Sequence, residues 1–306
     1  MIESLDPSAE RFLVDLNRIQ KSINSATQVI SSGYRVNRPS DAPDEISIIL
    51  QLHAELERSR QIQANLKQVH SEVATAQSTL ETVVRIVDRA RVLASQGAGT
   101  MQSGETRTTL AAEVQGLLEQ VVAASRTIVQ GRYIFGGDAD QNPPYELNLA
   151  NANGVERLSA AAATRLIQHP SGGSFTVGMS AQDIFDHRNS DDTLASDNVF
   201  AALNQLRVAL ESDDQAGIDA SLAALRGAGD RLNYALSRYG LTQQKIEQAL
   251  EFASGLDLRL KQELSDRRDA DLVEAALHLE RARNHQDAAL AARSLLPTTS
   301  LFDFLG

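Results

Sequence analysis

The sequence contains no cysteine and no tryptophan, and its 306 residues include only 5 tyrosines and 8 phenylalanines. Without cysteine there can be no disulfide bond, thiol nucleophile, iron–sulfur cluster or cysteine-ligated zinc site. So few aromatic side chains argue against a thick globular core around a roomy ligand pocket, because aromatic residues dominate such cores. Extended helical packing is the architecture that this composition favours.

The sequence also has no excess of basic residues: it contains 29 Lys and Arg and 40 Asp and Glu, which gives a formal net charge of −11. This balance gives no electrostatic footprint for nucleic-acid phosphates or an anionic membrane surface, so we expect neither as a partner. No run approaches the roughly 18 consecutive apolar residues of a membrane span. Residues 1–20 lack the basic region, apolar run and cleavage site of a signal peptide. We therefore expect any export to use a route other than general secretion.

The chain has only seven prolines, and residues 44–142 and 171–296 contain none. Because an interior proline breaks a helix, these two runs permit long helices. From Ile62 to Ala94 the apolar residues alternate at spacings of four and three, which predicts a long helix with one apolar face. The glycine-rich residues 95–105 predict a turn. Further helical periodicity occurs at 13–30 (through Leu13, Leu16, Ile23 and Ile30), 110–128, 199–210, 218–239 and 241–295.

Residues 139–195 differ from the rest, because they are rich in turn formers and contain short β-prone pieces such as Ser174–Val177. We therefore predict a mainly α fold. It is a long, coiled-coil-like helical bundle formed by the N- and C-terminal halves, with a small β-containing central insertion. In this arrangement the two chain ends lie side by side.

A search for catalytic or metal-binding patterns yields none that stands out. His278 and His285 lie one heptad apart, about 10 Å along a helix, and cannot share a metal ion without other elements. The adjacent acids Asp191–Asp192 and Asp213–Asp214 are typical of helix caps and solvated turns. We therefore expect no enzyme activity, no cofactor and no metal site; an enzyme built on a helical bundle is a remote alternative.

Three segments carry a resemblance to a known family. The segment SSGYRVNRPSDAP at 31–43 resembles the signature that follows the first helix in bacterial flagellins and in the related hook–filament junction proteins. GRYIFGGD at 131–138 resembles a segment more typical of the junction proteins. The C-terminal DADLVEAALHLERARNHQDAALAARSLL, followed by SLFDFLG, resembles the terminal helix of this family. The resemblance covers residues 10–140 and 195–306.

The resemblance implies how the chain is divided. Residues 1–40 and 265–306 would form a terminal helical polymerisation domain, whose paired helices lie in the innermost tube of an axial filament. Residues 41–138 and 196–264 would form a helical rod domain, and 139–195 a small outward-facing insertion. The motif and assembly residues that it implies are Gly33, Arg35, Val36, Asn37, Pro39, Ser40, Asp41, Pro43, Tyr133, Phe135, Gly136, Gly137, Leu272, Leu279, Leu301 and Phe304.

The resemblance also implies a function, that of a non-enzymatic structural subunit of the bacterial flagellum. Such a subunit is exported through the flagellum's own channel and is extracellular. Its implied partners are further copies in an axial filament, other axial proteins (hook-associated proteins and flagellin) and an export chaperone. GRYIFGGD and the tail residues Phe302 and Phe304 favour the junction protein, with the main filament flagellin as the alternative. A cytoplasmic coiled-coil scaffold is a remote alternative, because it does not explain the 31–43 segment.

Overall fold

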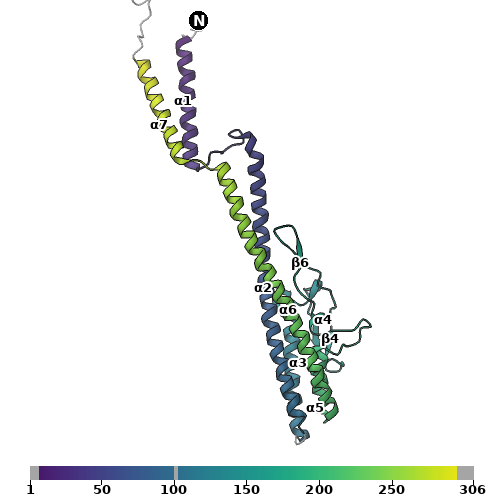
Figure 1. The fold of residues 1–306 in the computed structure, drawn as a ribbon. Coiled ribbons are helices and arrows are strands. Elements are labelled where there is room, and N and C mark those ends of the chain that lie inside the picture. The colour runs from purple at the N-terminus through teal and green to yellow at the C-terminus, as the bar shows by residue number, and fades with distance from the viewer. Residues whose placement is uncertain (1–6, 100–102, 295–306) are drawn as a thin grey trace, which may run out of the picture. The chain divides into compact units, whose positions relative to one another are not determined.

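The computed structural model describes residues 7–99 and 103–294, which Figure 1 traces from purple to yellow. Over these residues the chain forms seven α-helices, one short 3-10 helix and six strands, which confirms the prediction of a mainly α fold. The helices are α1 (Pro7–Ser32), α2 (Pro43–Gly97), α3 (Gly104–Ser125), α4 (Ala181–Ile184), α5 (Val199–Glu211), α6 (Gln215–Arg268) and α7 (Leu272–Ser294), and η1 is Gly137–Ala139.

The strands form three separate antiparallel pairs of two or three residues each. They are β1 (Ile128–Val129) with β2 (Arg132–Tyr133), β3 (Tyr145–Leu147) with β4 (Val155–Arg157), and β5 (Leu166–Gln168) with β6 (Ser174–Thr176). Such short hairpins are not stable by themselves in water and need a surface to pack against.

The chain divides into two compact units. Unit 1 comprises residues 1–58 and 256–306, and unit 2 comprises residues 59–255, so both long helices α2 and α6 contribute to each unit. The division into polymerisation, rod and insertion parts that the family resemblance implies stays a prediction.

Helix α2 is 55 residues long and shows how the sequence pattern produces a helix. It begins at Pro43, a first-turn position where the missing proline N–H costs no hydrogen bond. Asp44 and Glu45 follow in the same turn, where negative charge is favourable to the helix dipole. Every residue of the predicted apolar face is buried: Ile62, Leu66, Val69, Val73, Ala76, Leu80, Val83, Val87, Ala90 and Ala94.

Two predicted helix boundaries are wrong. The periodicity at 110–128 runs past the end of α3, and Ile128 lies in strand β1 with 54% of its surface exposed. The predicted helical region 241–295 is interrupted between Arg268 and Leu272. There the Asp271 carboxylate accepts hydrogen bonds from the backbone N–H groups of Val273 (2.8 Å) and Glu274 (3.1 Å), and so starts α7 as a new helix.

The core of unit 2 is shared by its helices and the central insertion, which lie against each other in Figure 1. An aromatic cluster joins them: Phe135 packs edge-on against Phe185 (ring centroids 5.4 Å apart) and against Tyr239 of α6 (6.2 Å). Phe200 of α5 contacts both Phe185 and Tyr145. Much of the small aromatic content is thus gathered in one layer, where the insertion packs on the helices instead of building a core of its own.

Candidate functional site

The two terminal helices of unit 1, α1 and α7, pack side by side (Figure 1). The less exposed residues of α1 follow a spacing of three and four through Phe12, Leu16, Ile19, Ile23 and Ala26. On α7 the corresponding residues are Ala275, Leu279 and Ala282. Gln286 Nε2 donates a hydrogen bond to Gln20 Oε1 (3.1 Å), and the Arg293 guanidinium lies 5.8 Å from the Phe12 ring centroid. The predicted pairing of the N- and C-terminal helices therefore occurs within one copy, over the residues that the structure describes.

The buried face of each terminal helix is shifted from the predicted one. Leu16 and Ile23 lie on it, but Leu13 and Ile30 are exposed. Leu279 is half-buried, whereas Leu272 is 52% exposed. The physical reason is that α7 carries apolar residues all round its axis, so periodicity alone cannot identify its inner face.

The outward faces of α1 and α7 carry several large apolar side chains among polar ones. Their exposed large apolar side chains are Leu13, Val14, Ile30, Leu272, Val273, Leu277 and Leu290, with exposed fractions between 37% and 72%. Large apolar side chains exposed in this number on one pair of helices favour an interaction site.

The 31–43 segment joins α1 to α2 and pairs with the α6–α7 junction in unit 1. Gly33 ends α1 with a positive φ of +74°, which glycine adopts without strain, and its N–H donates to Val29 O (2.9 Å). Arg35 N and Val36 N both donate to Arg268 O (2.8 and 3.2 Å), and Ala270 N donates to Gly33 O (2.9 Å). The backbone of the 31–43 segment is thus hydrogen-bonded to the backbone at the α6–α7 junction.

Side chains of the segment strengthen this junction. Arg35 Nη2 donates to Arg267 O (2.6 Å) and to the Glu45 carboxylate (3.1 Å), so one guanidinium links α6 and α2. The Arg268 guanidinium lies 3.8 Å from the Tyr34 ring centroid, a cation–π contact. Val36 is buried in a second apolar cluster with Ile49, Leu52, Leu56, Leu260 and Leu264.

The remaining motif residues form the turn that leads into α2. Asp41 Oδ2 accepts hydrogen bonds from the backbone N–H groups of Asn37 (3.0 Å) and Arg38 (2.7 Å). Asn37 Nδ2 in turn donates to Tyr34 O (2.7 Å). Pro39 and Ser40 are exposed at the turn. The Asp41 carboxylate therefore accepts hydrogen bonds from two backbone N–H groups that have no carbonyl partner in the turn, which explains an acid at this position.

The second motif, GRYIFGGD, lies in unit 2 and holds the insertion on the helices. Phe135 is fully buried, and its carbonyl oxygen accepts from Ala181 N (2.7 Å) at the start of α4. Gly137 has a φ of +61°, and a Cβ there would stand only 2.5 and 2.6 Å from the carbonyl oxygens of Ala161 and Ala162. Asp138 N donates to Ala162 O (2.8 Å). The glycine thus permits a close approach of two chain segments.

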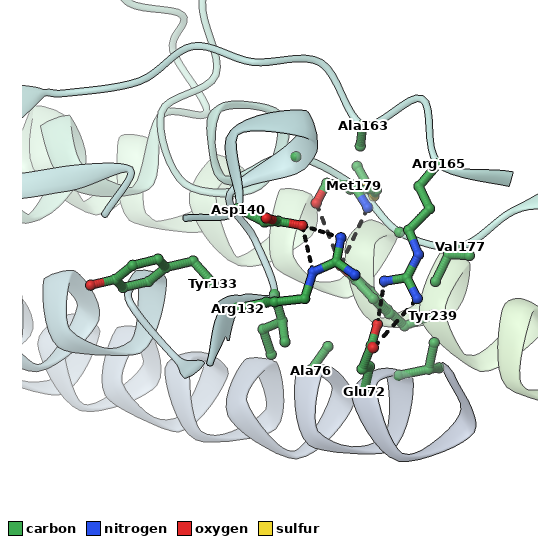
Figure 2. Close-up of a pocket in the computed structure, with 14 residues that line it drawn as sticks. Glu72, Ala76, Arg132, Tyr133, Asp140, Ala163, Arg165, Val177, Met179 and Tyr239 are labelled. Atoms are coloured by element: carbon green, nitrogen blue, oxygen red, sulfur yellow. Dashed lines mark hydrogen bonds and ion pairs between the residues drawn. The ribbon is translucent and has the colours of Figure 1, made fainter. Parts of the chain in front are cut away.

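Figure 2 shows the small cavity beside this motif, with two arginines pointing into it. Arg132 Nε donates to Asp140 Oδ2 (2.6 Å), and Arg165 Nη1 donates to the mostly buried Glu72 (2.6 Å). Hydrogen bonds from Gln141 and Arg132 hold the pKa of Asp140 below its usual value. Tyr133 lines the cavity, whose volume of about 60 Å³ has room for little more than water. The ion pairs give this cavity a structural role.

Some residues of the junction escaped sequence reasoning, and two expected residues cannot be placed. Tyr34, Arg268 and Asp271 were not singled out, although Asp271 followed by Glu274 is a recognisable helix-start pattern. Leu301 and Phe304 lie outside the described residues. Among the residues that the structure describes, no three His, Asp or Glu side chains gather as metal ligands would. None of the described helices is long and apolar enough to cross a membrane.

Comparisons with known proteins bear on these features. The family model described as the bacterial flagellin N-terminal helical region matches residues 8–140. Flagellar hook-associated protein 3 of Escherichia coli (strain K12) is 26% identical over 260 residues, which cover 79% of this chain and 80% of that protein. Flagellin of Bacillus subtilis (strain 168) is 24% identical over 270 residues, which cover 84% of each chain.

Solved structures share the fold. A flagellar hook-associated protein from Vibrio parahaemolyticus superimposes with a TM-score of 0.65 at 18% identity, over 75% of this chain and 100% of that one. FlgL from Bacillus cereus superimposes with a TM-score of 0.56 at 22% identity, over 72% of this chain and 100% of that one.

The fold and the junction define a class of helical protein in which the first and last helices pair and a central insertion interrupts the chain. Residues 8–140 match the bacterial flagellin family model, and most of the chain is similar to flagellar hook-associated protein 3. Both are the likenesses that the 31–43 and 131–138 segments predicted.

Proposed function

We propose that this chain is a non-enzymatic structural subunit of the bacterial flagellum, located at the junction between hook and filament. The observation that carries the proposal is the α1–α7 pair, whose helices bury one face against each other and expose apolar residues on the others. Burial of those residues between subunits would supply the free energy of assembly.

The junction role is supported by the match to flagellar hook-associated protein 3, which spans four-fifths of both chains, and by the GRYIFGGD segment. The alternative is the main filament subunit, supported by the match to Bacillus subtilis flagellin over 84% of each chain. Both are structural roles, and both place the chain outside the cell in the flagellum.

We further propose that residues 1–40 and 265–306 form the polymerisation domain and that 139–195 is the outward insertion. The residues proposed for assembly include the junction residues of the 31–43 segment and the apolar residues of α7. The partners are further copies of the chain, other hook-associated proteins and flagellin, and an export chaperone. Export proceeds through the flagellar channel.

The experiment changes two outward residues of α7, Val273→Ser with Leu277→Ser, in the full chain. Both side chains are more than half exposed, so their loss changes the stability of the free protein by less than about 0.5 kcal/mol. We expect the double variant to be produced and exported like the wild type, but to be lost from sheared flagella into the medium.

The matched control is Leu158→Ser, which also removes an exposed leucine but lies in the insertion. We expect this variant to stay in the flagellar fraction. Equal incorporation of the α7 double variant would contradict the role given to its outward face. Absence of the wild-type chain from flagella would contradict the flagellar assignment itself.

A further inference from the structure

A second exposed apolar row runs along α6 in unit 2, separate from the terminal helices. Successive residues at spacings of four and three lie on one side of this helix; we call the set the α6 face: Tyr234, Arg238, Leu241, Lys245, Gln248 and Phe252. Its three large apolar side chains are between 42% and 57% exposed, and the Phe252 ring also contacts the His169 ring of the insertion (centroids 5.5 Å apart). The buried side of α6, with Leu232, Tyr239 and Ile246, points elsewhere.

The α6 face carries two cations, Arg238 and Lys245. Across the residues that the structure describes, neither the Arg238 nor the Lys245 side chain has a hydrogen bond or ion pair with another residue. Tyr234 and Arg238 also border an open groove of about 430 Å³, together with Thr176, Met179 and Arg231. The α6 face therefore combines large apolar side chains with two cations, and it borders at one edge a groove that Asp183 also lines.

A face with the opposite properties occurs on α3 of the same unit. Its outward residues, again at spacings of four and three, form what we call the α3 face: Glu105, Thr109, Ala112, Gly116, Glu119 and Ala123. Every uncharged side chain in this set is small. No atom lies within 4 Å of the position that a Cβ on Gly116 would take, so the middle of the face is open.

We propose that the α6 face of one copy docks on the α3 face of a second copy. The inference rests on the proposed function and deepens it by naming a contact between subunits. In an antiparallel register that places Arg238 opposite Glu119, Leu241 faces Gly116 and Tyr234 faces Ala123, so that these two large side chains meet small ones. Phe252 would face Glu105 in this register and lies outside the proposed contact. The one pair of charges that face each other, Arg238 and Glu119, is of opposite sign, which favours this register over one that pairs like charges.

The contact joins two different surfaces, so it is heterologous. Each copy can use its α6 face for one neighbour and its α3 face for another, and the contact leads to growing chains unless a ring closes. A subunit of an axial structure requires contacts of this kind.

The absence of cysteine makes the test direct, because introduced cysteines are the only ones in the chain. Full-length Leu241→Cys and Gly116→Cys proteins are mixed and oxidised, and disulfide-linked heterodimers are quantified. The control replaces Leu241→Cys by Asn233→Cys, an exposed position about 100° round the helix from Tyr234. We expect at least tenfold more heterodimer from the first mixture. Equal yields would overturn the proposal.

Charge reversal tests the register. We expect Arg238→Glu in the Leu241→Cys protein to lower the yield about tenfold, and Glu119→Arg in the Gly116→Cys protein to restore at least half of it. The control Arg226→Glu, an exposed arginine on another side of α6, should leave the yield unchanged. Failure of Glu119→Arg to restore any of the yield would overturn the proposed register.

The result is separable from the flagellar assignment. Protein found in sheared flagella without the cross-link would overturn only this contact. A specific cross-link in protein that never reaches the flagellum would overturn only the proposed function.

Discussion

The replacement Gly137→Ala tests the structural role of the GRYIFGGD segment, and Gly131→Ala provides a matched control. Both glycines have positive φ angles, +61° and +78°, so alanine at either position costs about 1–2 kcal/mol of backbone strain. They differ in the space around them. At Gly131 no atom lies within 4 Å of an added Cβ, whereas at Gly137 two carbonyl oxygens lie at 2.5 and 2.6 Å.

The extra cost at Gly137 can be estimated from this contact. The backbone carbonyls of Ala161 and Ala162 must move away, and overpacking of this kind costs about 1–3 kcal/mol. Their movement also weakens the hydrogen bond from Asp138 N to Ala162 O, worth about 1 kcal/mol. Gly137→Ala should therefore destabilise unit 2 by about 2–4 kcal/mol more than Gly131→Ala does.

Urea and thermal unfolding, followed by near-ultraviolet circular dichroism of the buried tyrosines, measure both variants. For a unit of this size each kcal/mol lowers the midpoint by about 2–4 °C, so a 3 kcal/mol difference corresponds to about 6–12 °C. Equal midpoints for the two variants would refute the argument that Gly137 is required by a close approach of segments.

Two further predictions concern single side chains. Burial raises the pKa of Tyr239 to about 12 from an ordinary 10.0, so the folded protein keeps a proton that the unfolded chain loses. The contribution of Tyr239 to the free energy of unfolding is full below pH 10 and is lost as the pH rises to 12, a decline of about 3 kcal/mol. Tyr239→Phe should remove this decline from the free energies of unfolding measured by urea titration at pH 9 to 12. An unchanged dependence of that free energy on pH would contradict the prediction. Asp41→Ala removes two hydrogen bonds to backbone N–H groups and should cost about 1–2 kcal/mol locally. Amide exchange at Arg35 and Val36 should then accelerate about tenfold, and exchange at the wild-type rate would show that the turn does not hold the junction.

The long helices could be predicted because their pattern is local. In α2 the spacing of apolar residues from Ile62 to Ala94 repeats often enough to identify one face, and all ten residues of that face are buried. The family motifs likewise indicated two structurally important segments, since residues 31–43 and 131–138 both form hydrogen bonds with chain segments that are distant in the sequence.

The inner face of α7 and the role of the insertion could not be predicted in the same way. Leu272 and Leu279 both fit a heptad, and only the partner helix α1 decides which of them is covered. The capping of α7 by Asp271 interrupts a periodicity that otherwise continues. The strands of the insertion, β3 to β6, have three residues each, which is too few for an alternating pattern.

The most direct test of the proposed function is the position of the chain in intact flagella. An antibody fragment raised against residues 139–195 and carrying a gold label is applied to isolated flagella of the wild type, with flagella of a deletion strain as the control. Our account predicts label confined to one short zone between hook and filament. Label along the whole filament would identify the main filament subunit instead, and flagella without any label above the control would contradict the assignment to the flagellum.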